Sequence, residues 1–433
     1  MIARLRQFGQ RIHESLWFMP GLLVLGAFGL AYGLVSFDGR TDWQGEKQFP
    51  LLFGLGAEGS RGMLTAIAGS MLTVAALAFS STLTAITQVS SQYSPRVLRT
   101  FLRDRINQFV MGYFVATFAY CLVVLGTIRG ANENKFVPAT AVLVGLFLAL
   151  GGVVALIVFI HHMAASLQTG TIVRNIYEDT RKAIDRALPD LTPNPVDEPT
   201  NPDPLPDANW QRVTANETGY VETINTDQLF RWACRHQTLI RVEREVGAFV
   251  DDQTSVLSVQ DSPKLGGRDW PDTLHGYVSI GPHRNIEQDI AFGIQQLVDI
   301  ALKALSPGVN DTTTAIMAVD YLGAVVGQLA GRSFPTRFHA DGTYLRLVVQ
   351  AADFDAYLRL AFDLPRLNAK GNHAVLRRLL RALANVAAAT QSAGRRASVR
   401  RQVDLLVAYA EQTATTDYEK GQVRQLAHDL LPL

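Results

Sequence analysis

Four long runs without a charged residue constrain this chain more than any other feature of its sequence. They cover residues 15–37, 62–95, 106–128 and 137–160. An α-helix needs about 20 mostly apolar residues to cross the hydrocarbon core of a bilayer, and each run is long enough. Because lipid offers the backbone no hydrogen-bond partner, such segments must be helical. We therefore predict a polytopic transmembrane domain over residues 1–165. Its four helices are expected at about 15–37, 62–92, 106–128 and 137–161.

Basic residues predict the orientation of these helices. The first run is too long for a signal peptide, and no small-residue cleavage site follows it before Asp38, so we expect it to be retained. Arginines concentrate before the first run, between the second and third runs, and after the fourth, whereas the loops 38–61 and 129–136 are mixed in charge. The positive-inside rule then places both termini in the cytoplasm. The expected location is the bacterial cytoplasmic (inner) membrane, as a multi-pass protein.

The second run has an unusual distribution of side chains. On a helical wheel, small and hydroxyl residues share one face: Gly62, Ala66, Gly69, Thr73, Ser80, Thr84, Thr87 and Ser91. The opposite face carries Leu64, Ile67, Met71, Ile86 and Val89. Small residues with hydroxyls are typical of close helix packing, and this is one interpretation. The other is a water-filled pore, because channel linings use the same donors and acceptors. The pore-lining hypothesis names Thr73, Ser80, Thr84, Thr87 and Ser91.

Four arginines follow this run before the third one begins: Arg96, Arg99, Arg103 and Arg105. In a symmetric oligomer they would surround the cytoplasmic mouth of a pore and favour anions. The alternative is that they only determine membrane topology.

Composition limits the chemistry of the remaining chain. It has 40 basic and 39 acidic residues, which argues against a nucleic-acid-binding protein. The two cysteines, Cys121 and Cys234, are too few and too far apart for a disulfide framework or a zinc site. Neighbouring His161 and His162 point about 100° apart on a helix and make a poor ligand pair. The sequence therefore predicts no metal site and no cofactor.

The second half of the chain is predicted to be a cytoplasmic α+β domain. Together with the four membrane helices, its helical parts make the predicted fold class of the whole protein mainly α. A helical extension covers 166–188, and a linker with seven prolines covers 189–207. Short strand-like segments separated by turns predict a small β-barrel-like module over 208–283. Its order of strands is similar to the barrels of biotinyl and lipoyl carrier domains, but residues 210–260 lack the lysine that carries the cofactor. Residues 284–433 are predicted to be helical.

One polar segment of this domain is a candidate site. A helix over 285–305 ends at the turn Ser306-Pro307-Gly308, and Asn310 or Asp311 then caps the helix that follows. A helix N-terminus with several hydroxyls can instead bind an anion. The polar residues near this block are either ion-paired within the chain or clustered at a ligand pocket or subunit contact. They are Arg284, Asp289, Asp299, Asn310 and Asp311.

Several segments resemble a family of bacterial membrane proteins called domain of unknown function 2254. The strongest similarity lies in "SPRVLR" after the second run and "ALSPGVND" in the second half, with "GYVETI" between them. The similar segments span nearly the whole chain. The resemblance implies a membrane location and this architecture, and it implies no particular activity.

We weigh three functions from the sequence. No hydrolase, Walker, dinucleotide or zinc-protease motif occurs, so an enzyme is not predicted. The leading hypothesis is a homo-oligomeric ion channel, whose partners are the lipid bilayer, further copies of the chain and an inorganic ion, with a slight preference for an anion. The alternative is a membrane-anchored sensor or scaffold whose soluble domain binds a ligand or protein. A secondary transporter is third, because the four runs contain no ionisable residue for ion coupling.

Overall fold

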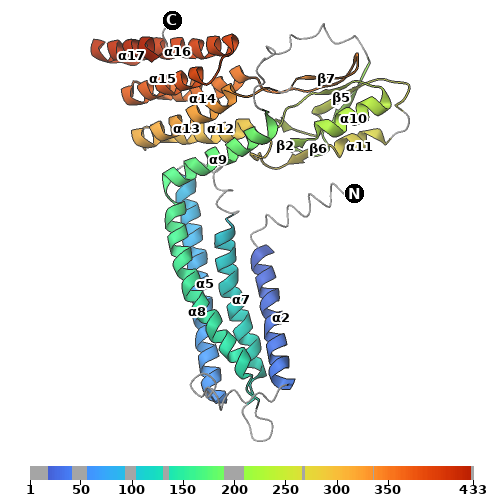
Figure 1. Cartoon of the computed structure of the whole chain (residues 1–433), viewed down its shortest axis with the longest axis vertical. Helices are drawn as coiled ribbons and strands as arrows, with labels where there is room; N and C mark the ends of the chain where they lie inside the picture. The colour runs from blue at the N-terminus through green and yellow to red at the C-terminus, as the bar shows by residue number, and fades with distance from the viewer. Residues whose placement is uncertain are drawn as a thin grey trace. The chain divides into compact units, whose positions relative to one another are not determined.

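The computed structural model describes residues 18–40, 56–92, 104–129, 136–189, 209–265, 269–334 and 336–430. The chain divides into two compact units, residues 1–168 and 169–433 (Figure 1). The proline-rich linker that we predicted lies, from residue 190 onward, outside the described residues.

In the described part of the first unit, four long helices lie at the four predicted positions. They are α2 (Phe18–Arg40), α5 (Ala57–Gln92), α7 (Arg105–Thr127) and α8 (Ala139–Ser166). Each is long and apolar enough to cross a membrane. Helix α7 contacts the other three helices and is the most buried of the four. The 36 residues of α5 correspond to about 54 Å, which exceeds a hydrocarbon core of about 30 Å.

Close backbone approach and buried hydroxyls fix the packing of this unit. A Cβ at Gly112 of α7 would lie 2.8 Å from the backbone of Pro20 on α2, so only glycine fits there. The hydroxyls of Tyr113 and Tyr120 donate to carbonyl oxygens of α8 at 2.9 Å and 2.7 Å. The Asp38 carboxylate of α2 accepts from two backbone amides in the first turn of α8, at 3.0 Å and 3.1 Å. Such bonds satisfy helix-end amides that lipid would leave unpaired.

A fifth helix, α13 (Thr312–Ala330), also meets the length and hydropathy of a membrane span. It lies in the second unit and packs against α9 (Thr169–Ala187), α12 (Ile290–Leu305) and α15 (His373–Ala388). Its Asp320 forms a two-bond ion pair with Arg378 of α15. A carboxylate and helical neighbours on several sides are typical of the core of a globular domain, and we interpret α13 in that way.

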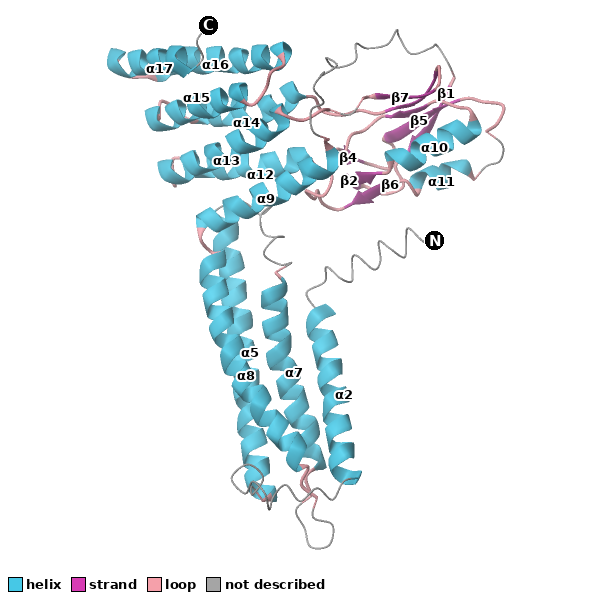
Figure 2. Cartoon of the chain, in the orientation of Figure 1, coloured by secondary structure: helices cyan, strands magenta, loops and turns pink. Residues whose placement is uncertain are grey.

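The β module forms two open sheets, and the prediction of a barrel was wrong. A five-stranded sheet has the order β1-β5-β3-β8-β7, and a three-stranded sheet has the order β4-β2-β6 (Figure 2). The first comprises β1 (Trp210–Thr214), β5 (Ser255–Gln260), β3 (Ile240–Val242), β8 (Tyr344–Val348) and β7 (Phe338–Asp341). The second comprises β4 (Phe249–Val250), β2 (Gly219–Ile224) and β6 (Val278–Gly281). Two further helices belong to this region, α10 (Thr226–His236) and α11 (Trp270–His275).

The five-stranded sheet crosses the boundary that we predicted at residue 283. Strands β7 and β8 form a hairpin within the part of the chain predicted to be helical, and β8 pairs in parallel with β3. The register places Ile240 opposite Leu347, and both side chains are buried. The β module is therefore completed by a hairpin that follows α13 in the chain.

The remainder of the second unit is helical. Helices α9, α12 and α13 pack together. The helices α14 (Phe354–Asn368) and α15 stack on α12 and α13, and α16 (Ala393–Thr413) and α17 (Asp417–Leu430) follow in the stack (Figure 2). We predicted 166–188 as an extension of the last membrane helix. The chain instead turns at residues 167–168, and α9 begins as a separate amphipathic helix. Its buried side chains include Ile172, Ile176 and Ile184.

Candidate functional site

The hydroxyl stripe of α5 faces outward from the four-helix unit. Thr73, Ser80, Thr84 and Thr87 are all exposed, as are Gly62, Ala66 and Gly69. The opposite face is buried, and α5 packs through it on α7 and α8. The side chain of Ser91 lies outside the described residues. Among the described helices of this unit, α5 packs on α7 and α8 through the opposite face, so the stripe is exposed.

The threonine hydroxyls of this stripe already have hydrogen-bond partners in their own helix. Thr73 donates to the Gly69 carbonyl at 2.9 Å, Thr84 to Ser80 at 3.0 Å, and Thr87 to Leu83 at 2.8 Å. Because each hydroxyl has one hydrogen, its outward side offers lone pairs only. These three threonines thus present acceptors, which stabilise water or a cation better than an anion.

One leucine interrupts the stripe. Leu77 lies on the same helical face between Thr73 and Ser80, and 62% of it is exposed. The series Thr73, Leu77, Ser80, Thr84 and Thr87 has alternating steps of four and three residues. That spacing keeps the five side chains on one face of the helix.

Three of the four arginines predicted at the mouth of the pore, Arg96, Arg99 and Arg103, lie outside the described residues. Arg105 is the first residue of α7 and is exposed.

Asp104, the residue before Arg105, caps α7 by accepting from the Ile106 amide at 2.9 Å. It also contacts His162 Nε2 of α8. The Ser166 hydroxyl lies 3.4 Å from that same nitrogen. A Ser–His–Asp relay needs the two partners on different nitrogens, so this cluster joins two helix ends and lacks the catalytic arrangement. We did not predict the contact, because 58 residues separate its members and no local pattern indicates it.

Arg284 and Asp289 form an ion pair with two hydrogen bonds in the second unit. Arg284 donates to the two carboxylate oxygens of Asp289 at 2.7 Å and 2.9 Å. Asp289 also caps α12 by accepting from the Phe292 amide at 2.9 Å, and its side chain is 3% exposed. The guanidinium lies 5.2 Å from the centre of the Phe292 ring. These contacts correspond to the intramolecular pairing that we considered first for this segment.

The other three residues of the predicted cluster lie elsewhere, on α12 and in the turn before α13. Asp299 accepts from Gln295 at 2.8 Å within α12. Asp311, at the opposite end of α12 from Asp289, caps α13 by accepting from the Thr314 amide at 3.0 Å. The 16 residues of α12 correspond to about 24 Å, so the five residues do not share one pocket. Asn310 precedes the cap with a φ of 47°, a conformation that asparagine tolerates well.

The Asp311 cap predicts a specific dependence of stability on pH. A hydrogen bond from the Thr314 hydroxyl, followed by the backbone amides, lowers the pKa of Asp311 below its usual value. A lowered folded-state pKa contributes stability above the unfolded pKa of about 3.9, and that contribution is lost as the pH falls through the folded value. We expect Asp311→Asn to cost up to about 1 kcal/mol at pH 7. Denaturant unfolding at pH 7 and at pH 2.5 should show this difference shrinking at the lower pH, and an equal difference at both would contradict the assignment.

In the described part of the chain, no three His, Cys, Asp or Glu side chains come close enough together to hold a metal ion. Cys121 is buried and Cys234 is half-buried, and both are free thiols.

Comparison with known proteins identifies the family. The family described as "Predicted membrane protein (DUF2254)" matches residues 13–385. The chain belongs to this family. Proteins described as uncharacterized from Mycobacterium tuberculosis (strain CDC 1551 / Oshkosh) and Mycobacterium bovis (strain ATCC BAA-935 / AF2122/97) are each 31% identical to it. Both alignments cover 98% of this chain and 81% of the relative. No solved structure matches. As a DUF2254 protein, the chain is a multi-pass membrane protein.

Proposed function

We propose that this DUF2254 protein is a homo-oligomeric ion channel in which α5 of each copy lines a shared pore. The observation that carries the proposal is the outward hydroxyl stripe on a helix whose other face is packed. A rotational axis would bring one such stripe from each copy to the centre of the assembly. The proposal assigns no catalytic step to the chain.

The flanks of the stripe support assembly around an axis. Leu72, Phe79 and Leu83 lie to one side of it and are about half exposed in the single chain. In a ring of helices these side chains would pack against a neighbouring copy, while the hydroxyl residues face water. Leu77 would then form an apolar ring within the lining, and such constrictions can gate a pore by excluding water.

The orientation is part of the proposal. Basic residues near the membrane helices favour cytoplasmic N- and C-termini in a bacterial inner membrane. The second unit would then lie in the cytoplasm, where it can assemble the ring or gate it.

Two features of the chain have opposite effects on whether the pore would prefer anions or cations. Arginines after α5 favour anions at the cytoplasmic mouth. The acceptor-only face of Thr73, Thr84 and Thr87 favours a cation within the lining. Since a lining acts along the whole path, we infer that its acceptors weaken the preference for anions that the arginines alone would give.

A bulky residue in the stripe provides the functional test. We expect Thr84→Trp to reduce unitary conductance at least about tenfold, because an indole from each copy would fill the lining where hydroxyls lie. The measurement is planar-bilayer recording of purified protein across a salt gradient, whose reversal potential gives the sign of the ion. The matched control is Phe147→Trp on α8, a side chain that is 60% exposed on another helix. Conductance left intact by Thr84→Trp in a stable oligomer would exclude α5 as the lining.

Self-association can be tested without any current. Ser80→Cys places a thiol on the stripe, and we expect oxidation in native membranes to link two copies through it. The native Cys121 is buried and Cys234 lies in the other unit, so a Cys234→Ser background removes the alternative crosslink.

Monomer alone, with no current at any voltage or pH, would favour the second candidate, a membrane-anchored sensor or scaffold. That candidate is supported by the threonine bonds within α5, which allow the stripe to face lipid without unsatisfied donors. The absence of ionisable side chains between Gly62 and Gln92 leaves a coupled transporter third.

A further inference from the structure

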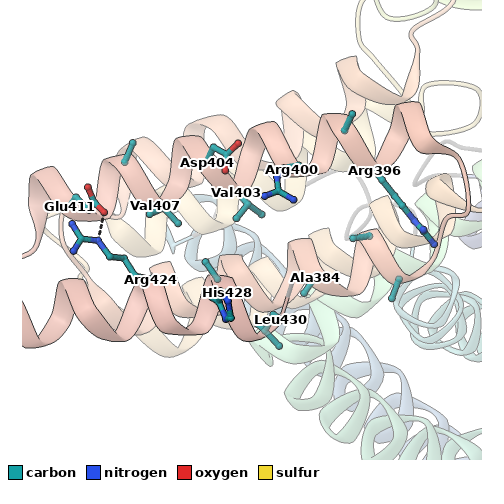
Figure 3. Close-up of a pocket in the computed structure, with 15 residues that line it drawn as sticks. Ala384, Arg396, Arg400, Val403, Asp404, Val407, Glu411, Arg424, His428 and Leu430 are labelled. Atoms are coloured by element: carbon teal, nitrogen blue, oxygen red, sulfur yellow. Dashed lines mark hydrogen bonds and ion pairs between the residues drawn. The ribbon is translucent and has the colours of Figure 1, made fainter. Parts of the chain in front are cut away.

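A groove of ≈ 730 Å³ lies where α15, α16 and α17 meet (Figure 3). Its volume falls in the range of sites that hold small molecules, about 300–1,000 Å³. Helix α17 packs on both α15 and α16, yet among its described residues only Val423 is buried. A helix of 14 residues held by so few buried side chains is weakly docked.

Alanines create this hollow. Helices normally interlock through side chains that fill the space between them, so that interiors reach the density of organic crystals. Here six alanines from the three helices line the groove: Ala384, Ala387, Ala388, Ala397, Ala408 and Ala427. Their methyl groups give an apolar floor without a hydrogen-bonding side chain. Such a floor suits an apolar body and offers nothing to recognise a nucleotide base.

The charges on the walls are unequally distributed. At one end the Arg424 guanidinium donates to Glu411 at 2.5 Å, and this bond holds the pKa of Glu411 below its usual value. That pair is ionised and neutral as a whole. Towards the other end lie Arg396 and Arg400, both exposed, with Asp404 one turn further along α16 (Figure 3). The described lining thus has three arginines against two carboxylates.

Neighbouring arginines on α16 are used differently. Arg395 donates to the carbonyls of Ala330 and Arg332 at 2.9 Å and 2.8 Å and stacks on Phe334. Arg401 lies 3.9 Å from Asp355. Arg395 and Arg401 thus pair within the chain outside the groove, whereas Arg396 and Arg400 line it. The Arg396 Nε already donates to the Thr390 carbonyl at 2.9 Å, so a head group would bind to the two terminal nitrogens of this guanidinium.

We propose that this groove binds a single-chain amphiphile with an anionic head group. The head lies at Arg396 and Arg400, and the apolar chain follows the alanine floor towards the Glu411–Arg424 pair. From Arg400 to Glu411 the helix rises about 16 Å, which sets the length of chain that the floor covers. Each methylene buried there adds about 0.8 kcal/mol, and the arginines supply charge-assisted bonds to a carboxylate or phosphate. The occupant fills the hollow under α17 and increases the burial of that helix.

Photo-labelling of the full-length protein in zwitterionic nanodiscs tests the proposal. The probe is hexadecanoic acid carrying a diazirine, and labelled peptides are mapped by mass spectrometry. We expect labels on α15, α16 and α17, with competition by an anionic amphiphile and none by hexadecanol at equal concentration. Stronger competition by hexadecanoate identifies a carboxylate ligand, whereas stronger competition by hexadecyl phosphate identifies a phosphate-bearing lipid. Labels confined to α2, α5, α7 and α8 would overturn the proposal.

Two groove variants and one control variant separate binding in the groove from general partition into lipid. Arg400→Gln is expected to reduce labelling of α16 about tenfold, since it removes one charge-assisted interaction with the head group. Arg401→Gln, the next residue along the chain and outside the groove, should leave it unchanged. Ala387→Phe fills part of the floor and should reduce labelling while the head-binding arginines remain. Equal labelling in all three variants would contradict binding of the probe in the groove. Because labelling needs no ionic current, its outcome is independent of the proposed channel.

Discussion

Replacing Asp289 with alanine is expected to lower the free energy of unfolding of residues 169–433 by about 3–5 kcal/mol. The carboxylate is almost fully buried, binds both Arg284 nitrogens that face it, and caps α12. Its removal leaves a guanidinium without its partner and an amide without its cap, and breaking a buried pair typically costs 3–5 kcal/mol. Arg284 is 26% exposed, so water recovers part of the loss and the lower half of this range is expected.

The measurement is denaturant-dependent hydrogen exchange of the purified full-length protein, which reports each unit separately. The control is Asp272→Ala, since this side chain is 92% exposed and its loss should change stability by less than about 0.5 kcal/mol. Asp289→Asn retains an oxygen for the cap and removes only the charge, so it should cost less than alanine. In a double-mutant cycle, Arg284→Gln with Asp289→Asn should cost clearly less than the two single changes added together. Strict additivity would show that the pair does not act as a unit.

The same region explains why a glycine precedes strand β4. Gly247 has a φ of 88°, and a Cβ there would lie 2.9 Å from the Arg284 guanidinium and collide with the Asp289 carboxylate. Burial, together with the charges of Asp289, Glu245 and Asp353, raises the pKa of Tyr357 above its usual value. Tyr357 therefore stays neutral beside three carboxylates. The loop before β4, the segment after β6 and the start of α12 are joined at this point.

The membrane unit followed from the sequence because lipid imposes a strong and local rule. Each of the four helices needed only a charge-free run, and each observed boundary lies close to the predicted one. The exceptions are α8, which ends at Ser166 rather than at 161, and α5, which begins at Ala57 and so contains Glu58 and Arg61. Arg61 is accommodated there because its guanidinium donates to the Ile128 carbonyl at 2.7 Å, a contact across 67 residues.

The second unit was harder to predict because its pairings are non-local. Strand β8 has the sequence YLRLV, and its five residues lie between longer helical segments. Its parallel pairing with β3 joins residues more than 100 positions apart, so no hairpin signal reveals it. The predicted barrel failed because the strands before residue 283 divide between two sheets, with β1, β3 and β5 in one and β2, β4 and β6 in the other. The outward face of α5 was predictable as a stripe, but its exposure follows only from how α7 and α8 cover the other side.

Substituting Gly293 with leucine is expected to have the second large effect, a loss of about 3 kcal/mol or more from the same unit. Gly293 lies on α12 where α9 crosses it closely. A Cβ at this position would lie 2.9 Å from the Cβ of Thr180 and collide with its hydroxyl. Thr180 is fully buried, and its hydroxyl is committed to the Ile176 carbonyl at 2.6 Å. A β-branched side chain in a helix has little freedom to move, so the larger residue must separate the two helices.

The expected signature is early loss of amide protection in α9, since this helix is held mainly by its contacts with α12 and α13. Gly293→Ala should cost about 1–3 kcal/mol, the usual cost of overpacking a core. Adding Thr180→Ala should recover part of that loss, because it removes the hydroxyl while the Cβ contact remains. The control is Gly327→Ala in α13, where nothing lies within 4 Å of the new methyl group. There the higher helix propensity of alanine should stabilise the protein by up to about 1 kcal/mol, so the same exchange has opposite signs at the two glycines. A similar small gain at Gly293 would show that α9 and α12 do not approach as closely as this structure has them.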